Sequence, residues 1–365
     1  MRKSYYNYPI EFVEDIFGES DVLATVLRKV TGAETPKVLI VADMNVVQRT
    51  EGLGSRIGRY VQAHNITLAG SPVVLAGGEK IKADNLQSAL SLVSAMLTAK
   101  VGQSDVILAL GGGTVLDVAG WAAAQVRGGT KIVRLPTTPT AMIDAAYADY
   151  AAIDSASVKD ALRVASLPSA VLIDTNFAKT VLDGVWRSGL SEAVRYALAA
   201  DAPLLKKIEA LVPAYQQRDQ KALEEVVHAV SASRIKKGDT KFAEWAALRL
   251  EALSGYKLPH GYAIAMALAI EVAYAVEKGM ITAANGERVM TILKENGSFE
   301  GAVHSNHLLS QTESLLLGID AWRLSIDGPS IPLLSALGKT TDELEPDREV
   351  YEKVFKNFSL SVAKG

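Results

Sequence analysis

Three consecutive glycines, Gly111 to Gly113, stand where an apolar run ends and a helical pattern begins, in the segment Leu108-Ala109-Leu110-Gly111-Gly112-Gly113-Thr114-Val115-Leu116-Asp117. Glycines between a strand and a helix let the main chain approach a diphosphate without a Cβ in the way, and the free N–H groups of the helix N-terminus face the anion. The spacing differs from the common G-x-G-x-x-G pattern. We predict a phosphate cradle here, against the alternative of a tight turn that binds nothing.

Two further turns are expected to line the same crevice, because ligands of open parallel sheets bind beyond the carboxyl ends of the strands. Gly77-Gly78-Glu79-Lys80 follows one expected strand, and Pro136-Thr137-Thr138-Pro139-Thr140 follows another. The threonine hydroxyls can donate to ribose or phosphate oxygens. Taken alone, turns of this composition are usually only turns.

The first half of the chain alternates short β-branched runs with helical patterns, which predicts strand-helix-strand units and a parallel sheet. Expected strands are Lys37–Asp43, Pro72–Leu75, Asp105–Leu110, Lys131–Leu135 and Ala170–Asp174, and expected helices include Arg56–Ala63 and Asn85–Ala99. From about Val185 the pattern is helical, and the proline-containing segment from Ser314 to Pro346 is expected to break into short helices and loops. We predict an α/β nucleotide-binding domain over residues 1–180 and a helical metal- and substrate-binding domain over residues 181–365.

Composition narrows the classes of partner. The 365-residue chain is 49% hydrophobic, enough for two cores, and its formal net charge of -3 gives no reason to expect nucleic acid or an anionic membrane. Because the chain has no cysteine, any metal must be held by His, Asp or Glu. The N-terminus lacks a signal peptide pattern, and the longest apolar run, Ala263 to Val276, is interrupted by Glu271 and shorter than a span of about 20 residues. We expect a cytoplasmic protein with no membrane segment that acts on a small molecule.

An ordered set of motifs extends through both predicted domains. It comprises Asp43 and Asn45, Gly78-Glu79-Lys80, Gly111-Gly112-Gly113 with Asp117, Arg127-Gly128, Pro136-Thr137-Thr138, Asp144, Leu172-Ile173-Asp174, the run from Gly189 to Tyr196, and His260-Gly261. In order and spacing this set resembles the dehydroquinate synthase-like sugar phosphate cyclases, closest to a divergent bacterial branch, within the superfamily that also contains iron-containing alcohol dehydrogenases. The resemblance covers about residues 8 to 280. It implies a Rossmann-like α/β domain with a parallel sheet, an all-α C-terminal domain and a homodimer.

The resemblance also implies a reaction. Bound NAD transiently oxidises a substrate alcohol, phosphate is eliminated, the hydride returns, and a ring closes by an aldol step. A divalent metal, with zinc or cobalt favoured, polarises the hydroxyl that loses hydride. By position, the implied nucleotide residues are Asp43, Asn45, Glu79, Lys80, Gly111, Gly112, Gly113, Asp117, Thr137 and Thr138. The implied substrate or catalytic residues are Arg127, Asp144, Lys159, Arg195 and Lys236, of which Arg195 stands at a lysine position of the family.

The metal site departs from the family pattern of one Glu and two His. Glu192 and His260 match, whereas Glu244 stands at the position of the other His and Leu248 at that of a further His. A Glu/Glu/His set can hold Zn, Mn, Fe or Mg, with a weaker preference for zinc. We predict Glu192, Glu244 and His260 as ligands. The alternatives left open are a surface or capping role for Glu244, a structural role for His260, and loss of the ion.

Substrate positions also differ from the family. Tyr150 stands at a lysine position, Asp160 at an asparagine position and Tyr262 at a glutamate position. These changes alter the charges available to a phosphate-bearing substrate. Three functions therefore compete: a sugar phosphate cyclase with a divergent site, an NAD(P)-dependent metal-containing polyol or alcohol dehydrogenase, and an inactive relative that serves as a binding or scaffold protein.

Overall fold

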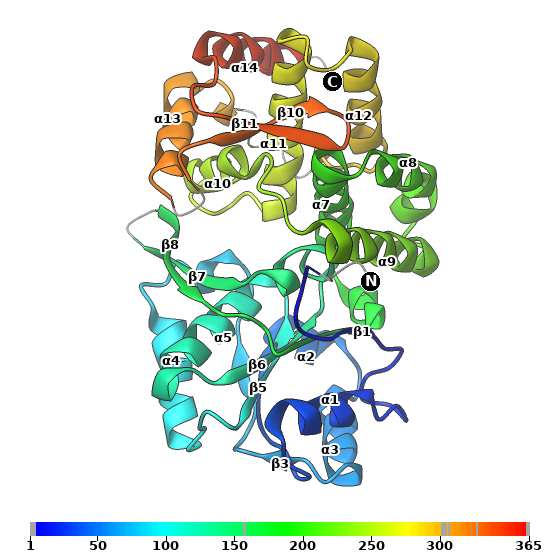
Figure 1. Ribbon diagram of the computed structural model, residues 1–365, viewed down its shortest axis with the longest axis vertical. Helices are drawn as coiled ribbons and strands as arrows, with labels where there is room; N and C mark the ends of the chain where they lie inside the picture. Colours follow the sequence, from blue (N-terminus) through cyan, green and yellow to red (C-terminus); the bar gives the residue numbers. More distant parts are fainter. Residues whose placement is uncertain (1–4, 156–157, 301–304, 306, 326–327, 363–365) are drawn as a thin grey trace. The chain divides into compact units, whose positions relative to one another are not determined.

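The computed structural model describes residues 5–155, 158–300, 305, 307–325 and 328–362. The chain divides into two compact units (Figure 1): an α/β unit, Tyr6–Leu182, and a helical unit that comprises Asp183–Gly365 and, from the N-terminus, Tyr5. The division falls between Leu182 and Asp183, next to the boundary at residues 180 and 181 expected from the sequence. The roles assigned to the two domains stay predictions.

A parallel sheet forms the core of the α/β unit. Its strand order is β1-β9-β6-β5-β2-β3, with β4 also paired to β2. The strands are β1 (Ile10–Phe12), β2 (Lys37–Asp43), β3 (Thr67–Leu68), β4 (Val73–Leu75), β5 (Val106–Gly111), β6 (Lys131–Pro136) and β9 (Ala170–Ile173). Strands β2, β5 and β6 are buried over nearly their whole length, which explains why they are continuous apolar runs and not alternating patterns.

Helices connect these strands and cover the sheet. Helix α5 packs against β2, β5 and β6, and α1 packs against β5 and β9. The helices of this unit are α1 (Val22–Thr31), α2 (Met44–Arg49), α3 (Leu53–Ala63), α4 (Gln87–Thr98), α5 (Gly113–Gln125) and α6 (Pro139–Ile143), with short 3-10 turns η1 (Glu79–Ile81), η2 (Val126–Gly128), η3 (Ala145–Tyr147) and η4 (Thr175–Thr180). An antiparallel hairpin of β7 (Tyr150–Ser155) and β8 (Val158–Ala165) packs on α5.

The helical unit is built around α11 (His260–Glu277). This helix is buried on almost every side and packs against α7 (Asp183–Ala200), α10 (Glu244–Leu253), α12 (Ala283–Glu295) and α14 (Arg348–Val362). Its apolar run therefore forms the centre of the core of this unit, as expected for a helix that is hydrophobic on all sides. The unit also contains α8 (Ala202–Gln216), α9 (Gln220–Lys237), α13 (Thr312–Arg323) and a hairpin of β10 (Ile331–Ala336) and β11 (Lys339–Glu343).

The expected fold is confirmed, with differences in detail. The C-terminal unit is not entirely α-helical, because β10 and β11 form an antiparallel hairpin where loops and short helices were expected. The turn of this hairpin docks on the α7–α8 junction: Gly338 has φ 78, its N–H donates to Leu198 O at 2.8 Å, and an added Cβ would lie 2.3 Å from Ala202 N. Among the described residues, no helix has the length and apolar character needed to cross a bilayer.

Candidate functional site

The carboxyl ends of three strands of the α/β unit meet at Asp43. Strand β2 pairs with β3 and β4 on one side and with β5 on the other. The strand order therefore reverses between β2 and β5, which makes this position a topological switch point. A Cβ added at Gly77 would lie 2.6 Å from Asp43 Oδ2, and one added at Gly111 would lie 3.3 Å from Asp43 Cβ. The glycine turn thus lies at the place where open α/β sheets bind their ligands.

The glycine turn opens α5 directly. Strand β5 ends at Gly111, Gly112 is extended with φ -73 and ψ 176, and α5 begins at Gly113 without a side-chain cap from the described residues. A Cβ at Gly112 would lie 3.2 Å from Thr138 Cγ2, so close packing as well as ligand approach favours glycine. Gly111 and Gly112 are buried, whereas Gly113 and Thr114 are half-buried. The accessible part of the turn is therefore the first residues of the helix.

Most of the other predicted nucleotide residues surround this turn. Asp43 caps α2 by accepting from Asn45 N at 2.7 Å, and Asn45 Nδ2 donates to the same Oδ1 at 3.1 Å. Thr137 is fully buried and its N–H donates to Gly111 O at 3.0 Å. Thr138 Oγ1 caps α6 by accepting from Ala141 N at 3.3 Å. Lys80 is exposed.

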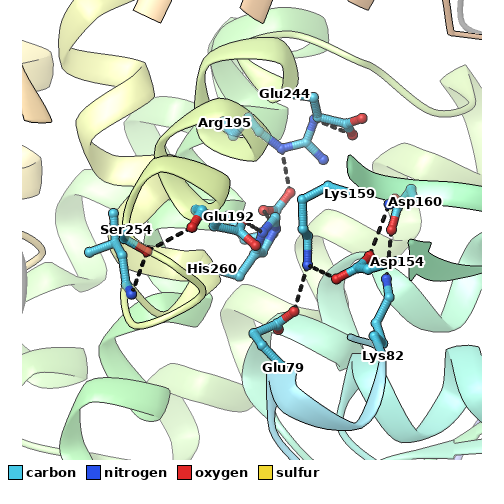
Figure 2. Close-up of polar contacts among 12 residues, drawn as sticks. Glu79, Lys82, Asp154, Lys159, Asp160, Glu192, Arg195, Glu244, Ser254 and His260 are labelled. Carbon is cyan, nitrogen blue, oxygen red and sulfur yellow. Dashed lines mark hydrogen bonds and ion pairs between the residues drawn. The ribbon is translucent and has the colours of Figure 1, made fainter. Parts of the chain in front are cut away.

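Two further predicted residues, Glu79 and Asp117, belong to a buried cluster of ion pairs in the same unit (Figure 2). Lys82 Nζ lies 2.7 Å from Asp160 Oδ1. The same Nζ lies 2.6 Å from Asp117 Oδ2. Lys159 Nζ lies 2.7 Å from Glu79 Oε2 and 3.2 Å from Asp154 Oδ2. The cluster joins η1, α5 and the β7–β8 hairpin. Its four carboxylates face two lysines and Arg163, whose Nη2 lies 3.8 Å from Asp160 Oδ2.

Burial and charge act against one another in this cluster. Burial by itself lowers the pKa of Lys82, but Asp117 and Asp160 outweigh it and raise that pKa well above its usual range. Burial raises the pKa of Asp117 against the opposing effect of Lys82, and it raises the pKa of Asp154 against Lys82 and Lys159. Lys82, Asp154 and Asp160 were not predicted as partners. The Glu-x-x-Lys spacing from Glu79 to Lys82 was the available signal, whereas the hairpin that carries Asp154 and Asp160 left none.

The predicted substrate residues of this unit are not all brought together. Lys159 belongs to the ion-pair cluster, and Asp144 is half-buried at the end of α6. Arg127 is exposed in η2, beyond the C-terminal end of α5, with a left-handed φ of 52. Since α5 rises about 1.5 Å per residue, Arg127 lies about 20 Å from the glycine turn at the other end of the helix.

In the helical unit, α7 and α11 bring Glu192 and His260 face to face. A Cβ added at Gly261 would lie 2.0 Å from Ser188 Cβ, so the absence of a side chain lets the start of α11 touch α7. Glu192 follows Ser188 by one helical turn and shares its face. His260 Nε2 consequently lies 3.9 Å from Glu192 Oε2, and Glu192 is fully buried.

The carboxylate of Glu244, the third predicted metal ligand, pairs with Arg195 (Figure 2). Arg195 Nε lies 2.5 Å from Glu192 Oε1, and Arg195 Nη1 lies 3.3 Å from Glu244 Oε1. Arg195 Nη1 also donates to Thr240 O at 2.8 Å, and Lys241 Nζ lies 3.7 Å from Glu244 Oε2. The described part of the chain contains no preformed group of three His, Asp or Glu side chains suited to a metal. Lys236 is exposed in the last turn of α9.

Glu251 is the functional candidate that the sequence did not indicate. It is fully buried in the last turn of α10, and its Oε1 lies 2.6 Å from His260 Nδ1. The eight residues between Glu251 and His260 carry no ligand-like spacing. The contact depends on the loop that folds α11 back against α10.

Comparisons with known proteins agree with this architecture. The family model described as 3-dehydroquinate synthase N-terminal matches residues 72–188. A 3-dehydroquinate synthase of Shewanella halifaxensis is 27% identical over 330 residues, which cover 88% of this chain and 81% of the relative. The solved 2-epi-5-epi-valiolone synthase of Streptomyces hygroscopicus superposes with a TM-score of 0.81 at 22% identity, covering 98% of this chain and 97% of that one. The chain is thus similar to 3-dehydroquinate synthases over most of its length.

Two solved structures that resemble this chain carry cofactors of the expected kinds. The valiolone synthase was solved with NAD+ and Zn2+ bound. A 2-deoxy-scyllo-inosose synthase with a TM-score of 0.77 and 18% identity, covering 98% of this chain and 99% of that one, was solved with carbaglucose-6-phosphate, NAD+ and Co2+. In the present chain, the α/β unit has the glycine turn at the start of α5, and the helical unit pairs Glu244 with Arg195.

Proposed function

We propose that this dehydroquinate synthase-like protein is a sugar phosphate cyclase, a carbon–oxygen lyase that uses NAD to remove phosphate and close a ring. The observation that carries the proposal is the glycine turn at the switch point of the sheet, where Gly112 and Gly113 open the 13-residue helix α5. The relatives named 3-dehydroquinate synthase, which align over most of the chain, support the reaction class.

The α/β unit would hold the dinucleotide through its main chain first. The N–H groups and positive dipole at the start of α5 stabilise a pyrophosphate without a counter-charged side chain. The Asp43 carboxylate, fixed by Asn45, would accept from ribose hydroxyls. The hydroxyl of Thr138 would donate to the same ligand. Thr137 is fully buried and is proposed to hold the glycine turn through its N–H bond to Gly111 O. Glu79, Lys80 and Asp117 are proposed as further nucleotide-binding residues.

A divalent ion fits Glu192 and His260 in the helical unit. Carboxylate and imidazole are ligand types that zinc and cobalt accept, and the two facing atoms are 3.9 Å apart. A metal supplies polarisation of the substrate hydroxyl that gives up hydride. Glu244 would join the set only by leaving Arg195 and Lys241. With two protein ligands, the remaining coordination positions are left to water or substrate oxygens.

The five proposed substrate residues differ in how much of their charge is available. Lys159 and Arg195 are each paired with two carboxylates, which lowers their attraction for an anionic substrate. Arg127 and Lys236 are exposed, and Asp144 is half-buried. We propose a sugar phosphate as substrate, whose phosphate would need cationic partners. Arg127 lies at the far end of α5 from the glycine turn, so it does not contribute to a site at that turn. A homodimer in the cytoplasm is proposed from the family resemblance. Sedimentation of the purified protein tests the dimer.

The test joins one binding assay to two product assays. Fluorescence titration with NAD and NADH should show saturable binding, and a panel of sugar phosphates should release inorganic phosphate without net NADH. Net NADH from polyols would instead assign the chain to the dehydrogenases of the superfamily. Saturable NAD binding with neither product would identify a non-catalytic binding protein, and failure to bind NAD would overturn all of the enzyme hypotheses.

A further inference from the structure

His260 lies between two buried carboxylates of the helical unit, at the point where α11 begins. Its Nδ1 is 2.6 Å from Glu251 Oε1, and its Nε2 is 3.9 Å from Glu192 Oε2 (Figure 2 shows the side of Glu192). The imidazole side chain keeps 32% of its surface exposed, whereas both carboxylate side chains are fully buried. Nδ1 is therefore hydrogen-bonded to the buried Glu251, and Nε2 is directed toward Glu192.

The position of Glu251 is fixed by the loop between α10 and α11. Ser254 Oγ and Tyr256 N donate to Glu251 O at 2.7 Å and 3.0 Å. Ser254 Oγ in turn accepts from Leu258 N at 3.0 Å, two residues before His260. The main chain of Glu251 is thus tied to the loop that ends at His260, and its side chain closes the same loop by contacting the ring.

This contact selects one tautomer of the imidazole. An ionised carboxylate can only accept, so Nδ1–H donates to Glu251 and Nε2 carries the lone pair. The neighbouring negative charge also makes Nε2 a stronger electron donor. A ring with its proton on Nε2 would present an N–H group to Glu192 and could not coordinate an ion there.

We propose that Glu251 is a positioning residue for a metal centre made by Glu192 and His260. It holds the imidazole plane and the Nδ1–H tautomer so that Nε2 is ready to bind a divalent ion beside Glu192. The arrangement is a carboxylate-histidine-metal relay, in which the outer carboxylate tunes the affinity of the inner ligand. The inference rests on the metal site of the proposed function, but it adds a residue and a role that the cyclase assignment does not contain.

A purely structural role for Glu251 makes a different prediction. If the contact only fastens α10 to the start of α11, replacing Glu251 would lower stability and leave metal affinity unchanged. The chain provides a matched control in Glu271, another fully buried carboxylate, which lies on α11. Its Oε1 accepts from Trp245 Nε1 at 2.7 Å and Tyr351 OH at 2.8 Å, and it does not touch His260 in the described structure.

The first experiment measures Zn2+ and Co2+ affinity of the full chain by competition with a chromophoric chelator. Glu251→Gln removes the charge and permits the wrong tautomer, so it should weaken metal binding by about 10- to 100-fold. Glu271→Gln should bind both metals as the wild type does. Equal affinities of Glu251→Gln and wild type, equal losses in the two variants, or no metal binding by the wild type would each overturn the proposal.

A second experiment covers the case in which Glu251→Gln does not fold. Nitrogen-15 NMR of the wild-type chain, with His260→Gln to assign the signal, should show a protonated Nδ1 and an unprotonated Nε2 that shifts on addition of Zn2+. An Nε2–H tautomer would contradict the role given to Glu251. Phosphate release is recorded on the same protein, so a correct metal result without phosphate release would overturn the proposed reaction and keep the positioning role.

Discussion

The α/β unit and the helical unit hold their candidate functional groups in different ways. In the α/β unit, the cradle is mainly main chain, since β2, β4 and β5 end beside one another and a glycine turn opens α5. In the helical unit, the groups are side chains from α7, α10 and α11, and each is already bonded to another side chain. A site built from main-chain groups can thus be predicted from the local sequence. A site built from side chains depends on which distant residue each side chain bonds to.

The ion-pair cluster of the α/β unit is also made of side chains from distant parts of the sequence. Removing Lys82 from it should have the largest effect on stability of the changes considered. Lys82→Met would remove the ion-pair partner of Asp117 and leave Asp160 with Arg163, which lies 3.8 Å away, and should lower the free energy of unfolding by about 3–5 kcal/mol. Urea denaturation measures the change.

The control for Lys82→Met is Lys37→Met. Lys37 pairs with Asp105 at 3.1 Å, with side-chain exposures of 32% and 15%, so its loss should cost about 1 kcal/mol or less. Equal losses in the two variants would mean that burial of the cluster does not set its energy.

A second prediction concerns pH in the helical unit. Burial raises the pKa of Glu271 to about 7 from its ordinary value of 4.5, against the hydrogen bonds of Tyr351 and Trp245, which lower it. The folded chain therefore holds a proton that the unfolded chain releases, so the contribution of Glu271 to stability is complete below pH 4.5 and is lost as the pH rises to 7. The loss is about 3 kcal/mol at 1.36 kcal/mol per pKa unit.

Urea denaturation between pH 5 and pH 8 tests this sign. Glu271→Gln does not titrate, so the difference in unfolding free energy between variant and wild type should grow in favour of the variant as the pH rises. A constant difference across this range would show that Glu271 keeps an ordinary pKa in the fold.

A smaller effect is expected where α7 and α11 touch. Gly261→Ala places a Cβ 2.0 Å from Ser188 Cβ, so the two helices must separate, at a cost of about 1–3 kcal/mol in unfolding free energy. The matched change Gly58→Ala, in α3 of the α/β unit, meets no atom within 4 Å and should stabilise by about 0.5–1 kcal/mol. Thermal unfolding of both variants gives the comparison. Unchanged stability of Gly261→Ala would contradict the close contact of α7 and α11 that brings His260 next to Glu192.

The sequence predicted the sheet and the glycine turn because both are encoded locally. Strands such as β2 and β5 are short apolar runs that end at polar or glycine residues, and Gly111 to Gly113 mark the end of β5 within one residue. The same local rule brought Asp43, Thr137 and Thr138 to one edge of the sheet, since parallel strands share their carboxyl end.

The remaining contacts could not be read from the sequence because they join distant residues. Nothing near Glu244 indicates that Arg195 will take its carboxylate, and nothing near Glu251 indicates that it will hold His260. The β10–β11 hairpin was missed for a related reason, since its turn is stabilised by docking Gly338 on the end of α7. Hairpin β7–β8, which carries Lys159, likewise depends on packing against α5.

The central claim is that the start of α5 binds a pyrophosphate, and isothermal titration of NAD into Gly112→Asp and Gly112→Asn tests it most directly. Both residues can cap α5 and have the same shape, so fold stability should be similar, but only the aspartate repels the anion. We predict that Gly112→Asp binds NAD at least about 10-fold more weakly than Gly112→Asn, which is about 1.4 kcal/mol. Equal NAD affinity in the two variants, with both folded, would contradict the account.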